Sequence, residues 1–474
     1  MRKIEVPKGT FENSLNLDSV RHFPSIECLD KEQKKELKKR IDDIIDFHSK
    51  SKLAYQAVNF SAEWLLDNGF EERDLFDDSI QESKKYFYRD PWKKSSLIAV
   101  HEGKKAITEG FHLINSHADS PCLKVKPRPL RIETDEDKLY DTLGIKLSTI
   151  PHGGIVVPYW IGQPVEIIGY TIDKNNSRRE INFKGVIGVN SAHVDISEYE
   201  DVTTAFSPEK SLEIIIGYSD KKSFLKHLKF ESIDDFANTH LWAVPVNKMF
   251  TIDDCNQNLL VGYGHDDRTS VFSTIDALIK TKNPEYSAIA WISDNEEIFD
   301  PAPVGTEGPL FYMFLENFLN RQEKIEQRKI SDLEKYKLYT NSKMIVGDVS
   351  VASYGHDFEE MDSKSSAKIG LGAVIEGGDI QGNDPHFVRY LRNLVSNKNS
   401  EKGICHQICG QFYHQDMMEL WGSNESDHKR LVSKGIPEIW VGMPCASLHS
   451  PVEIICPGDE YATSELYRRF FESK

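Results

Sequence analysis

Five clusters of polar residues carry side chains that could do chemistry, and each follows an apolar run typical of a buried strand. In an open α/β sheet, side chains at the carboxyl ends of the strands converge on one crevice, so residues far apart in the sequence can meet there. The clusters are INSHADSPC with His117 and Asp119, GYGHDDRTS with Asp266, SDNEEIF with Glu296 and Glu297, VGDVS with Asp348, and ASLHSPVE with His449 and Glu453.

Imidazole and carboxylate ligands together suit Zn²⁺, Mn²⁺ or Co²⁺, and they need no thiolate. Two such ions, roughly 3.5–4 Å apart, require one shared carboxylate and two or three further ligands each. Two histidines and three acids meet this count. One carboxylate is left over, and it would act as a general base toward a metal-bound water. The adjacent Glu296 and Glu297 suit such a division, because neighbouring residues at a strand end point in different directions.

Each cluster also has an ordinary structural explanation. A single histidine among sixteen is more often a surface or core residue than a ligand, and NEE alone is usually a solvated turn or the start of a helix. HADSP alone could be an ordinary turn after a strand. The joint occurrence of all five clusters is therefore what favours a metal site.

The elements that must position these residues alternate between strand and helix. Asp30, with Gln33 three residues later, predicts a capped helix in DKEQKKELKKRIDDIIDFHSK. Further helices are predicted in LAYQAVNFSAEWLLDNGF, RTSVFSTIDALIKT, GPLFYMFLENFLNRQ and PHFVRYLRNLVS, and strands in SSLIAVHEG, GFHLINSH, SAIAWIS, KMIVGDVS and IPEIWVG. This alternation predicts an α/β fold, an open mixed sheet flanked by helices on both faces.

Residues 126–257 have a different sequence pattern, in which β-branched runs such as PVEIIGYTID and EINFKGVIGV are separated by turns such as DKNNS. We therefore expect an inserted β-rich domain at 126–257. The host domain would be formed by a first segment at 1–125 and a second segment at 258–474.

The composition narrows the class of protein. Of 474 residues, 39% are hydrophobic and 28% charged, which is typical of a globular chain. The formal net charge of −17 argues against a general nucleic-acid or anionic-membrane surface. Seven scattered cysteines favour a reducing compartment, and no apolar run approaches the roughly 18 residues of a membrane span. We expect a cytoplasmic protein with neither nucleic acid nor membrane as a partner.

Several motifs carry a resemblance to a known family. SHADSPCLKVKP resembles the first metal motif of the aspartyl aminopeptidase and aminopeptidase I family of zinc metallopeptidases (metallopeptidase family eighteen), in which this motif precedes an inserted β domain. HDDRTSVFSTIDAL is similar to the family's Asp-Asn-Arg motif with Asp in place of Asn. DNEEI is similar to its paired-glutamate motif, and GIPEIWVGMPCASLHSPVEI to its closing His-Ser motif.

The resemblance implies a metal-dependent aminopeptidase that hydrolyses the N-terminal residue of peptides, and it implies a zinc-peptidase-like catalytic domain. His117 and Asp348 would bind one zinc ion, Glu297 and His449 a second, and Asp266 would bridge the two. Mn²⁺ or Co²⁺ could replace zinc. By the same resemblance, the general base would be Glu296, and Asp119 would orient His117 through its ring N–H.

The resemblance also implies a homo-oligomer in which dimers assemble into a dodecamer, partly through the β insertion acting as a dimerisation and lid domain. His193 in NSAHVDI matches a histidine that relatives supply across the dimer to a neighbour's substrate site, although a structural role fits it equally well. Where relatives carry a lysine after G-x-V-I, this chain has Glu376. Glu376 would repel an acidic side chain, so we expect a preference for neutral N-terminal residues.

Two other functions remain open at this point. The chain could be another two-metal amidohydrolase, such as a deacetylase or carboxypeptidase, or a catalytically silent scaffold subunit. Silent relatives typically lose a ligand or the base, whereas every expected ligand and Glu296 are present here. No P-loop, His-Glu-x-x-His helix or Gly-x-Ser-x-Gly elbow supports a different hydrolytic mechanism.

Overall fold

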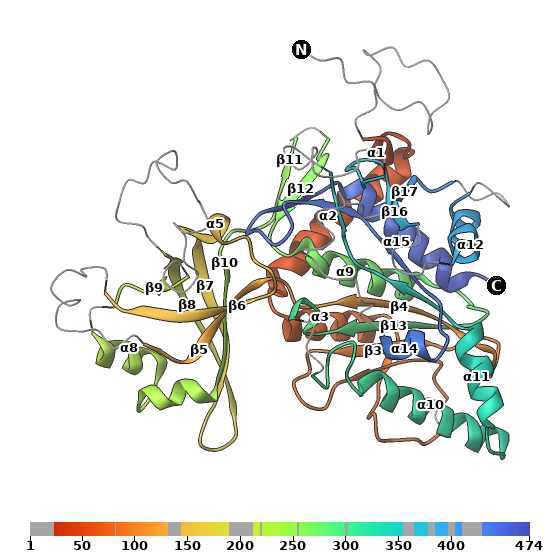
Figure 1. The fold of residues 1–474 in the computed structure, drawn as a ribbon, viewed down its shortest axis with the longest axis horizontal. Coiled ribbons are helices and arrows are strands. Elements are labelled where there is room, and N and C mark those ends of the chain that lie inside the picture. The colour runs from red at the N-terminus through yellow and green to blue at the C-terminus, as the bar shows by residue number, and fades with distance from the viewer. Residues whose placement is uncertain are drawn as a thin grey trace, which may run out of the picture.

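The computed structural model describes residues 23–80, 82–130, 144–188, 212–218, 220–253, 256–298, 302–353, 365–377, 384–396, 403–409 and 429–474. Figure 1 shows two bodies side by side: a large sheet covered by helices, and a β-barrel at the left. His193 lies outside the described residues, so its predicted position stays a prediction.

Over the described ranges, nine strands form the large sheet, which is mixed. At its centre β13, β4, β14 and β18 run parallel to one another. The carboxyl ends of these strands therefore meet at one edge. In spatial order the strands are β1 (Glu71–Glu72), β2 (Lys85–Arg89), β3 (Leu97–His101), β13 (Ser287–Ser293), β4 (Phe111–His117), β14 (Lys343–Val346), β18 (Glu438–Gly442), β16 (Ala373–Glu376) and β17 (His406–Cys409).

Helices cover both faces of the sheet, as the sequence predicts (Figure 1). One face is covered by α1 (Pro24–Glu27), α2 (Lys31–Lys50), α3 (Ala54–Asp67), α9 (His265–Lys280), α12 (Pro385–Val395) and α15 (Pro457–Glu472). The other is covered by α10 (Leu310–Glu326), α11 (Asp332–Asn341) and α14 (Lys429–Ser433). The predicted capping box of α2 is confirmed, because the Asp30 side chain accepts from Gln33 N and the Gln33 side chain accepts from Asp30 N.

The two faces follow from the side-chain alternation of each strand. In β13, Ala288 and Ala290 belong to the core under α9 and α15, whereas Ile289 and Trp291 belong to the core under α10. Every residue of β13 is buried. This explains why the sequence of β13 reads as a continuous apolar run rather than an alternating one.

The inserted β-rich domain is a closed barrel within the described ranges, and every strand pairing in it is antiparallel. Its strands are, in spatial order, β10 (Thr239–Pro245), β5 (Cys122–Leu130), β6 (Lys146–His152), β9 (Ile214–Ile215), β8 (Arg178–Ile187) and β7 (Pro164–Ile172). The short helices α5 (Val157–Trp160) and α8 (Lys221–Leu228) pack on its core. The predicted domain limits at 126 and 257 stay predictions.

A small third sheet lies beside the large one in the described part of the chain. It contains β11 (Phe250–Ile252), β12 (Leu259–Gly262), β20 (Glu453–Ile455), β19 (Pro444–Ala446) and β15 (Ser350–Val351). β12 leads directly into α9, and the β19–β20 turn contains His449. This sheet therefore brings the HDD and LHSPVE motifs together, although they are far apart in the sequence.

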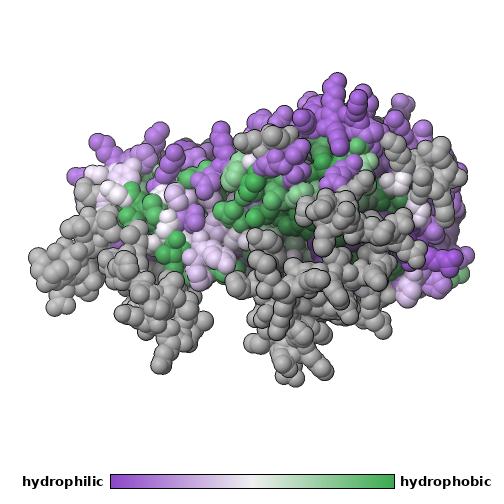
Figure 2. All heavy atoms as spheres, turned by 90° about the horizontal axis from the view of Figure 1, so that it is seen from above, coloured by the Kyte–Doolittle hydropathy of each residue, from purple (hydrophilic) through white to green (hydrophobic). Residues whose placement is uncertain are grey.

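Figure 2 shows one face of the molecule, on which apolar side chains gather toward the middle and hydrophilic side chains border them along the upper margin. Exposed large apolar residues occur on both bodies, for example Tyr159 in the barrel domain and Phe250 on β11. Across the ranges described, no helix combines the length and apolarity that crossing a bilayer requires.

A buried ion-pair network joins three helices behind the sheet. Arg40 of α2 donates to Glu460 of α15 from Nε at 2.5 Å and from Nη2 at 2.6 Å, and to Asp276 of α9 from Nη1 at 2.5 Å. Burial opposes ionisation of Asp276, but the Arg40 charge outweighs it and holds the pKa of Asp276 below its ordinary value.

Replacing Arg40 with methionine should therefore lower the free energy of unfolding by about 3–5 kcal/mol, because the buried Glu460 would lose its cationic partner and Asp276 would keep only Lys280. Urea unfolding of the protein at neutral pH measures this loss. A matched control is Lys50→Met, which removes an exposed i,i+4 pair with Asp46 and should cost less than about 1 kcal/mol.

The pH dependence has a definite sign. A carboxyl with a depressed folded-state pKa contributes stability above its unfolded pKa, about 3.9 for Asp, and loses that contribution as the pH falls. The difference between wild type and Arg40→Met that comes from Asp276 should therefore persist down to about pH 4 and shrink as the pH falls further, through the lowered pKa of Asp276. A difference that stays constant from about pH 4 to about pH 2 would contradict the ionic origin of the effect.

Candidate metal centre

The side chains of the five polar clusters lie together at one edge of the large sheet. His117 ends β4, and Glu296 and Glu297 follow the parallel neighbour β13 in the short 3-10 helix η5 (Glu296–Ile298). Asp348 lies two residues after β14, which pairs with the other side of β4. Asp266 lies in the first turn of α9, and His449 lies in the turn between β19 and β20.

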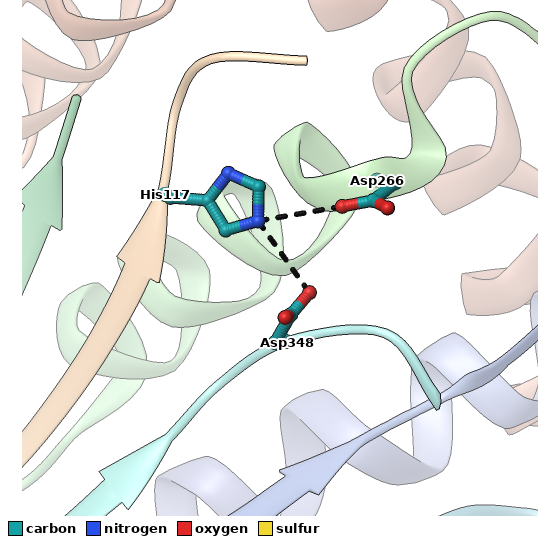
Figure 3. A group of neighbouring side chains, drawn as sticks. All are labelled: His117, Asp266 and Asp348. Carbon is teal, nitrogen blue, oxygen red and sulfur yellow. Dashed lines mark ion pairs between the residues drawn. The ribbon is translucent and has the colours of Figure 1, made fainter. Parts of the chain in front are cut away.

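Three acids surround the outer nitrogen of His117. Its Nε2 lies 3.3 Å from Asp266 Oδ1, 3.6 Å from Asp348 Oδ1 and 3.5 Å from Glu296 Oε2. Figure 3 shows His117, Asp266 and Asp348 converging from three different elements on one point. The imidazole and the carboxylates therefore present their donor atoms to a common small volume.

A second group of donor atoms lies on the other side of Asp266. His449 Nε2 is 3.3 Å from Asp266 Oδ2 and 3.6 Å from Glu297 Oε2. The two oxygens of Asp266 thus face two different histidines at equal distances. This is the arrangement of a carboxylate placed between two neighbouring cation sites.

These separations fit zinc better than they fit direct hydrogen bonds. The N···O distances of 3.3–3.6 Å between the two histidines and their facing carboxylates exceed the 2.7–3.2 Å range of an ordinary N–H···O bond. Two atoms bonded to one tetrahedral zinc ion at about 2.0–2.1 Å would lie about 3.3–3.4 Å apart. The donor set of imidazoles and carboxylates is also one that zinc accepts.

The electrostatics of the cluster call for a cation. Burial, and after it the charge of Asp266, raises the pKa of Glu297 well above its ordinary value, and burial likewise raises the pKa of Asp348. Glu297 Oε1 is buried and has no hydrogen-bond partner among the described residues. Crowded, buried carboxylates of this kind are costly unless a positive charge neutralises them, so these residues fit a metal ion.

Asp119 holds three residues of the centre through hydrogen bonds. Its backbone oxygen accepts from His117 Nδ1 at 3.1 Å, while its side-chain Oδ1 lies 3.4 Å from the same nitrogen. The two side-chain oxygens accept the backbone N–H groups of Glu296 and Glu297, both at 3.2 Å. Asp119 therefore contacts His117 mainly through its main chain, and its carboxylate positions the paired glutamates.

Glu453 has no assigned role in the sequence prediction, yet it holds two elements of the centre. Its carboxylate accepts backbone N–H groups from Gly264 at 3.0 Å, Asp266 at 3.1 Å and His449 at 3.1 Å. The side chain is 1% exposed. The only sequence signal was its place in the LHSPVE cluster, where nothing indicated that it would bind backbone rather than metal.

His152 was missed by the sequence reasoning. It ends β6 of the barrel, and its Nε2 lies 2.8 Å from Asp119 Oδ2. Glu376, the residue expected to disfavour acidic substrates, is buried at the end of β16 and accepts a hydrogen bond from Ser350 Oγ at 3.0 Å. Ser350 is two residues from Asp348, which connects Glu376 to the region of the centre.

Comparison with known proteins places this fold and site among the zinc metallopeptidases. A family profile described as aminopeptidase I zinc metalloprotease (M18) matches residues 47–471. The chain therefore belongs to the M18 family of zinc metallo-aminopeptidases.

Individual relatives agree with this assignment. The chain is 27% identical over 478 residues to a probable M18 family aminopeptidase 1 of Borrelia garinii subsp. bavariensis, covering 94% of this chain and 98% of that one. It is 24% identical over 423 residues to a probable M18 family aminopeptidase 1 of Clostridium acetobutylicum, covering 84% and 86%.

Solved structures share the fold. An M18 aminopeptidase from Thermotoga maritima superposes with a TM-score of 0.81 at 21% identity, covering 96% of this chain and 100% of that one. A structure of the mApe1 dodecamer of S. cerevisiae superposes with a TM-score of 0.67 at 19% identity, covering 91% of this chain and 96% of that one. These likenesses confirm the α/β fold with its inserted barrel.

Proposed function

We propose that this chain is a two-zinc aminopeptidase, and that the shared carboxylate of Asp266 is the feature that makes it so. His117 and Asp348 would hold one ion, His449 and Glu297 would hold the other, and the Asp266 carboxylate would be shared by both. The observation that carries this proposal is the pair of 3.3 Å distances from Asp266 Oδ1 to His117 and from Asp266 Oδ2 to His449.

Bound zinc would lower the pKa of a coordinated water and polarise the scissile carbonyl. The protein's own part in proton transfer falls to Glu296, whose carboxylate lies at the site but is 16% exposed, against 5% for Glu297. Glu296 takes the proton of the attacking water and returns it to the leaving amine. The more enclosed Glu297 acts as a ligand.

The free α-amine of a peptide would be anchored by the carboxylates of the centre, which restricts cleavage to the first residue. Another two-metal amidohydrolase is the second candidate, since it would need the same ligands. The retention of every ligand and of Glu296 argues against a silent scaffold. We also propose a homo-oligomer, supported by the dodecamer of the yeast relative.

The reaction is tested with a panel of free-amine and N-acetylated aminoacyl-anilides, assayed on metal-stripped protein and after zinc is restored. We expect release of the first residue from free-amine substrates only, and only with zinc. Hydrolysis of the N-acetylated substrates alone would support the amidohydrolase candidate instead. If fully metallated protein cleaves none of the substrates, a catalytically silent scaffold subunit becomes the favoured function in place of the aminopeptidase and the amidohydrolase.

The N-terminal residue preference is a separate expectation. Glu376 is a buried carboxylate, and a second negative charge nearby would be unfavourable in a low-dielectric site. Wild type should therefore cleave leucyl and alanyl substrates with a higher kcat/KM than aspartyl ones. Glu376→Lys should shift the Asp-to-Leu ratio of kcat/KM by about tenfold or more, a free-energy change of about 1.4 kcal/mol.

Glu71→Lys is the matched control, because Glu71 is exposed and lies at the far edge of the sheet on β1. It should leave the Asp-to-Leu ratio unchanged. Exclusive cleavage of aspartyl and glutamyl substrates by wild type would show that Glu376 does not set the preference.

A further inference from the structure

The end of strand β6 belongs to the barrel but contacts the metal centre of the other body. Within the barrel, His152 pairs with Cys122 of β5. Beyond the strand end, the chain continues through Gly153 and Gly154. His152 contacts Asp119, and Gly154 contacts His449. This contact is made within one chain, so it does not depend on assembly.

His152 donates a hydrogen bond into the support of the centre. Its Nε2 lies 2.8 Å from Asp119 Oδ2, and both side chains are about 5% exposed. A carboxylate only accepts, so the proton of this bond is on His152 Nε2. The imidazole ring is held in place by an edge-to-face contact with Trp242, with 4.9 Å between ring centroids.

Asp119, which His152 holds in place, contacts three residues of the centre in turn. Its carboxylate accepts the backbone N–H groups of Glu296 and Glu297, and its backbone oxygen accepts from His117 Nδ1. A shift of Asp119 would therefore move the proposed base Glu296 and two proposed ligands, Glu297 of the second ion and His117 of the first. His152 is the only imidazole that contacts the Asp119 carboxylate from the barrel side in the described ranges.

The two glycines that follow His152 let the backbone approach the second ion site. Gly154 O accepts from His449 Nδ1 at 2.9 Å, which directs His449 Nε2 at Asp266 and, in the neutral ring, leaves Nε2 as the nitrogen that can bind a metal. Gly153 has φ +75°, and a Cβ there would lie 2.9 Å from Glu297 Oε2. A Cβ at Gly154 would lie 3.4 Å from His449 Nδ1.

We infer that the His152–Gly154 segment of the barrel is a built-in support of the metal centre, with His152 as a positioning residue for Asp119. The inference rests on the proposed two-zinc site. It gives the barrel a role within each subunit: holding Asp119 through His152 and the tautomer of His449 through Gly154. Metal affinity is then coupled to how the barrel sits on the catalytic body.

Three variants separate positioning from packing. His152→Phe keeps an aromatic ring against Trp242 but removes the donor. His152→Gln keeps a donor that can reach Asp119. His240→Phe is the matched control, because His240 lies on β10 of the same barrel and packs edge-to-face on the same Trp242 ring, with centroids 5.2 Å apart.

Zinc affinity is measured on metal-stripped full-length protein by competition with a chromophoric chelator, and folding is checked by circular dichroism. His152→Phe should bind zinc about tenfold or more weakly, the effect usual for residues that orient metal ligands. His152→Gln should bind within about threefold of wild type, a residual of less than about 0.7 kcal/mol. His240→Phe should match wild type. The visible spectrum of the Co²⁺-loaded protein should change for His152→Phe alone.

The outcomes are distinct. Wild-type affinity in His152→Phe would overturn the inference while leaving the proposed function intact. Equal losses in His152→Phe, His152→Gln and His240→Phe would show a packing role only, which also overturns it. If wild type itself binds no zinc, the proposed function fails and takes the inference with it. Should His152→Phe not fold, His152→Asn replaces it, because the shorter amide cannot reach Asp119. Weaker zinc binding in His152→Asn with wild-type binding in His152→Gln would support the inference. Equal zinc binding in the two variants would refute it.

Discussion

Replacing Glu296 with glutamine should lower kcat by about 10²–10⁴-fold, the usual contribution of a general acid–base residue, while zinc stays bound. Glutamine keeps the shape of the side chain and the backbone N–H bond from residue 296 to Asp119, so the centre should hold its geometry. Only the ability to accept the proton of the attacking water is lost. KM for a neutral substrate should change little, because the residue acts in the transition state.

The neighbouring glutamate provides the sharpest control. Glu297→Gln also removes one carboxylate, but Glu297 faces His449 and Asp266 rather than open space. Its loss should appear first as weaker zinc binding, and added zinc should restore part of the activity. Metal content and kcat measured on both variants decide between the roles. If Glu296→Gln loses zinc and Glu297→Gln keeps it, the two assignments must be exchanged.

Replacing Asp266 with alanine should weaken zinc binding at both sites by more than about 100-fold, because even residues that merely orient a ligand cost about 10–100-fold. Among the described residues, Asp266 is the side chain that directs one oxygen at His117 and the other at His449. His117→Ala and His449→Ala should each weaken one site and largely spare the other. Calorimetric titration of metal-stripped protein gives the number of ions and their affinities for all three variants.

These three variants test whether the Asp266 carboxylate binds both ions. A single bound ion in Asp266→Ala, with wild-type affinity, would show that the carboxylate serves only one site. Loss of both ions in His117→Ala would show that the sites are not independent, and the ligand sets would have to be redrawn.

Much of the fold could be predicted because its signals are local. The helix and strand patterns around β4, β13, β14 and α9 define alternating elements, and parallel central strands place their carboxyl ends at one edge. The clustering of His117, Glu297 and Asp348 follows from that rule together with the residue types. Asp266 and His449 needed a further step, because Asp266 follows β12 and His449 lies in the β19–β20 turn of the small third sheet, which no sequence pattern indicated.

The supporting residues could not be predicted for a physical reason. Glu453 binds three backbone N–H groups from two segments, and backbone donors leave no mark on the sequence. His152 meets Asp119 only because the barrel packs on the other body, a contact that depends on tertiary placement rather than on spacing. Its sequence, PHGG, reads as an ordinary turn after a strand.

The central claim is that two ions share Asp266. It is tested most directly by anomalous diffraction at the zinc absorption edge on crystals of the zinc-loaded protein. The account predicts two peaks roughly 3.5–4 Å apart, one beside His117 and Asp348 and the other beside His449 and Glu297, with Asp266 between them. A single peak, or two peaks that do not both contact Asp266, would contradict it.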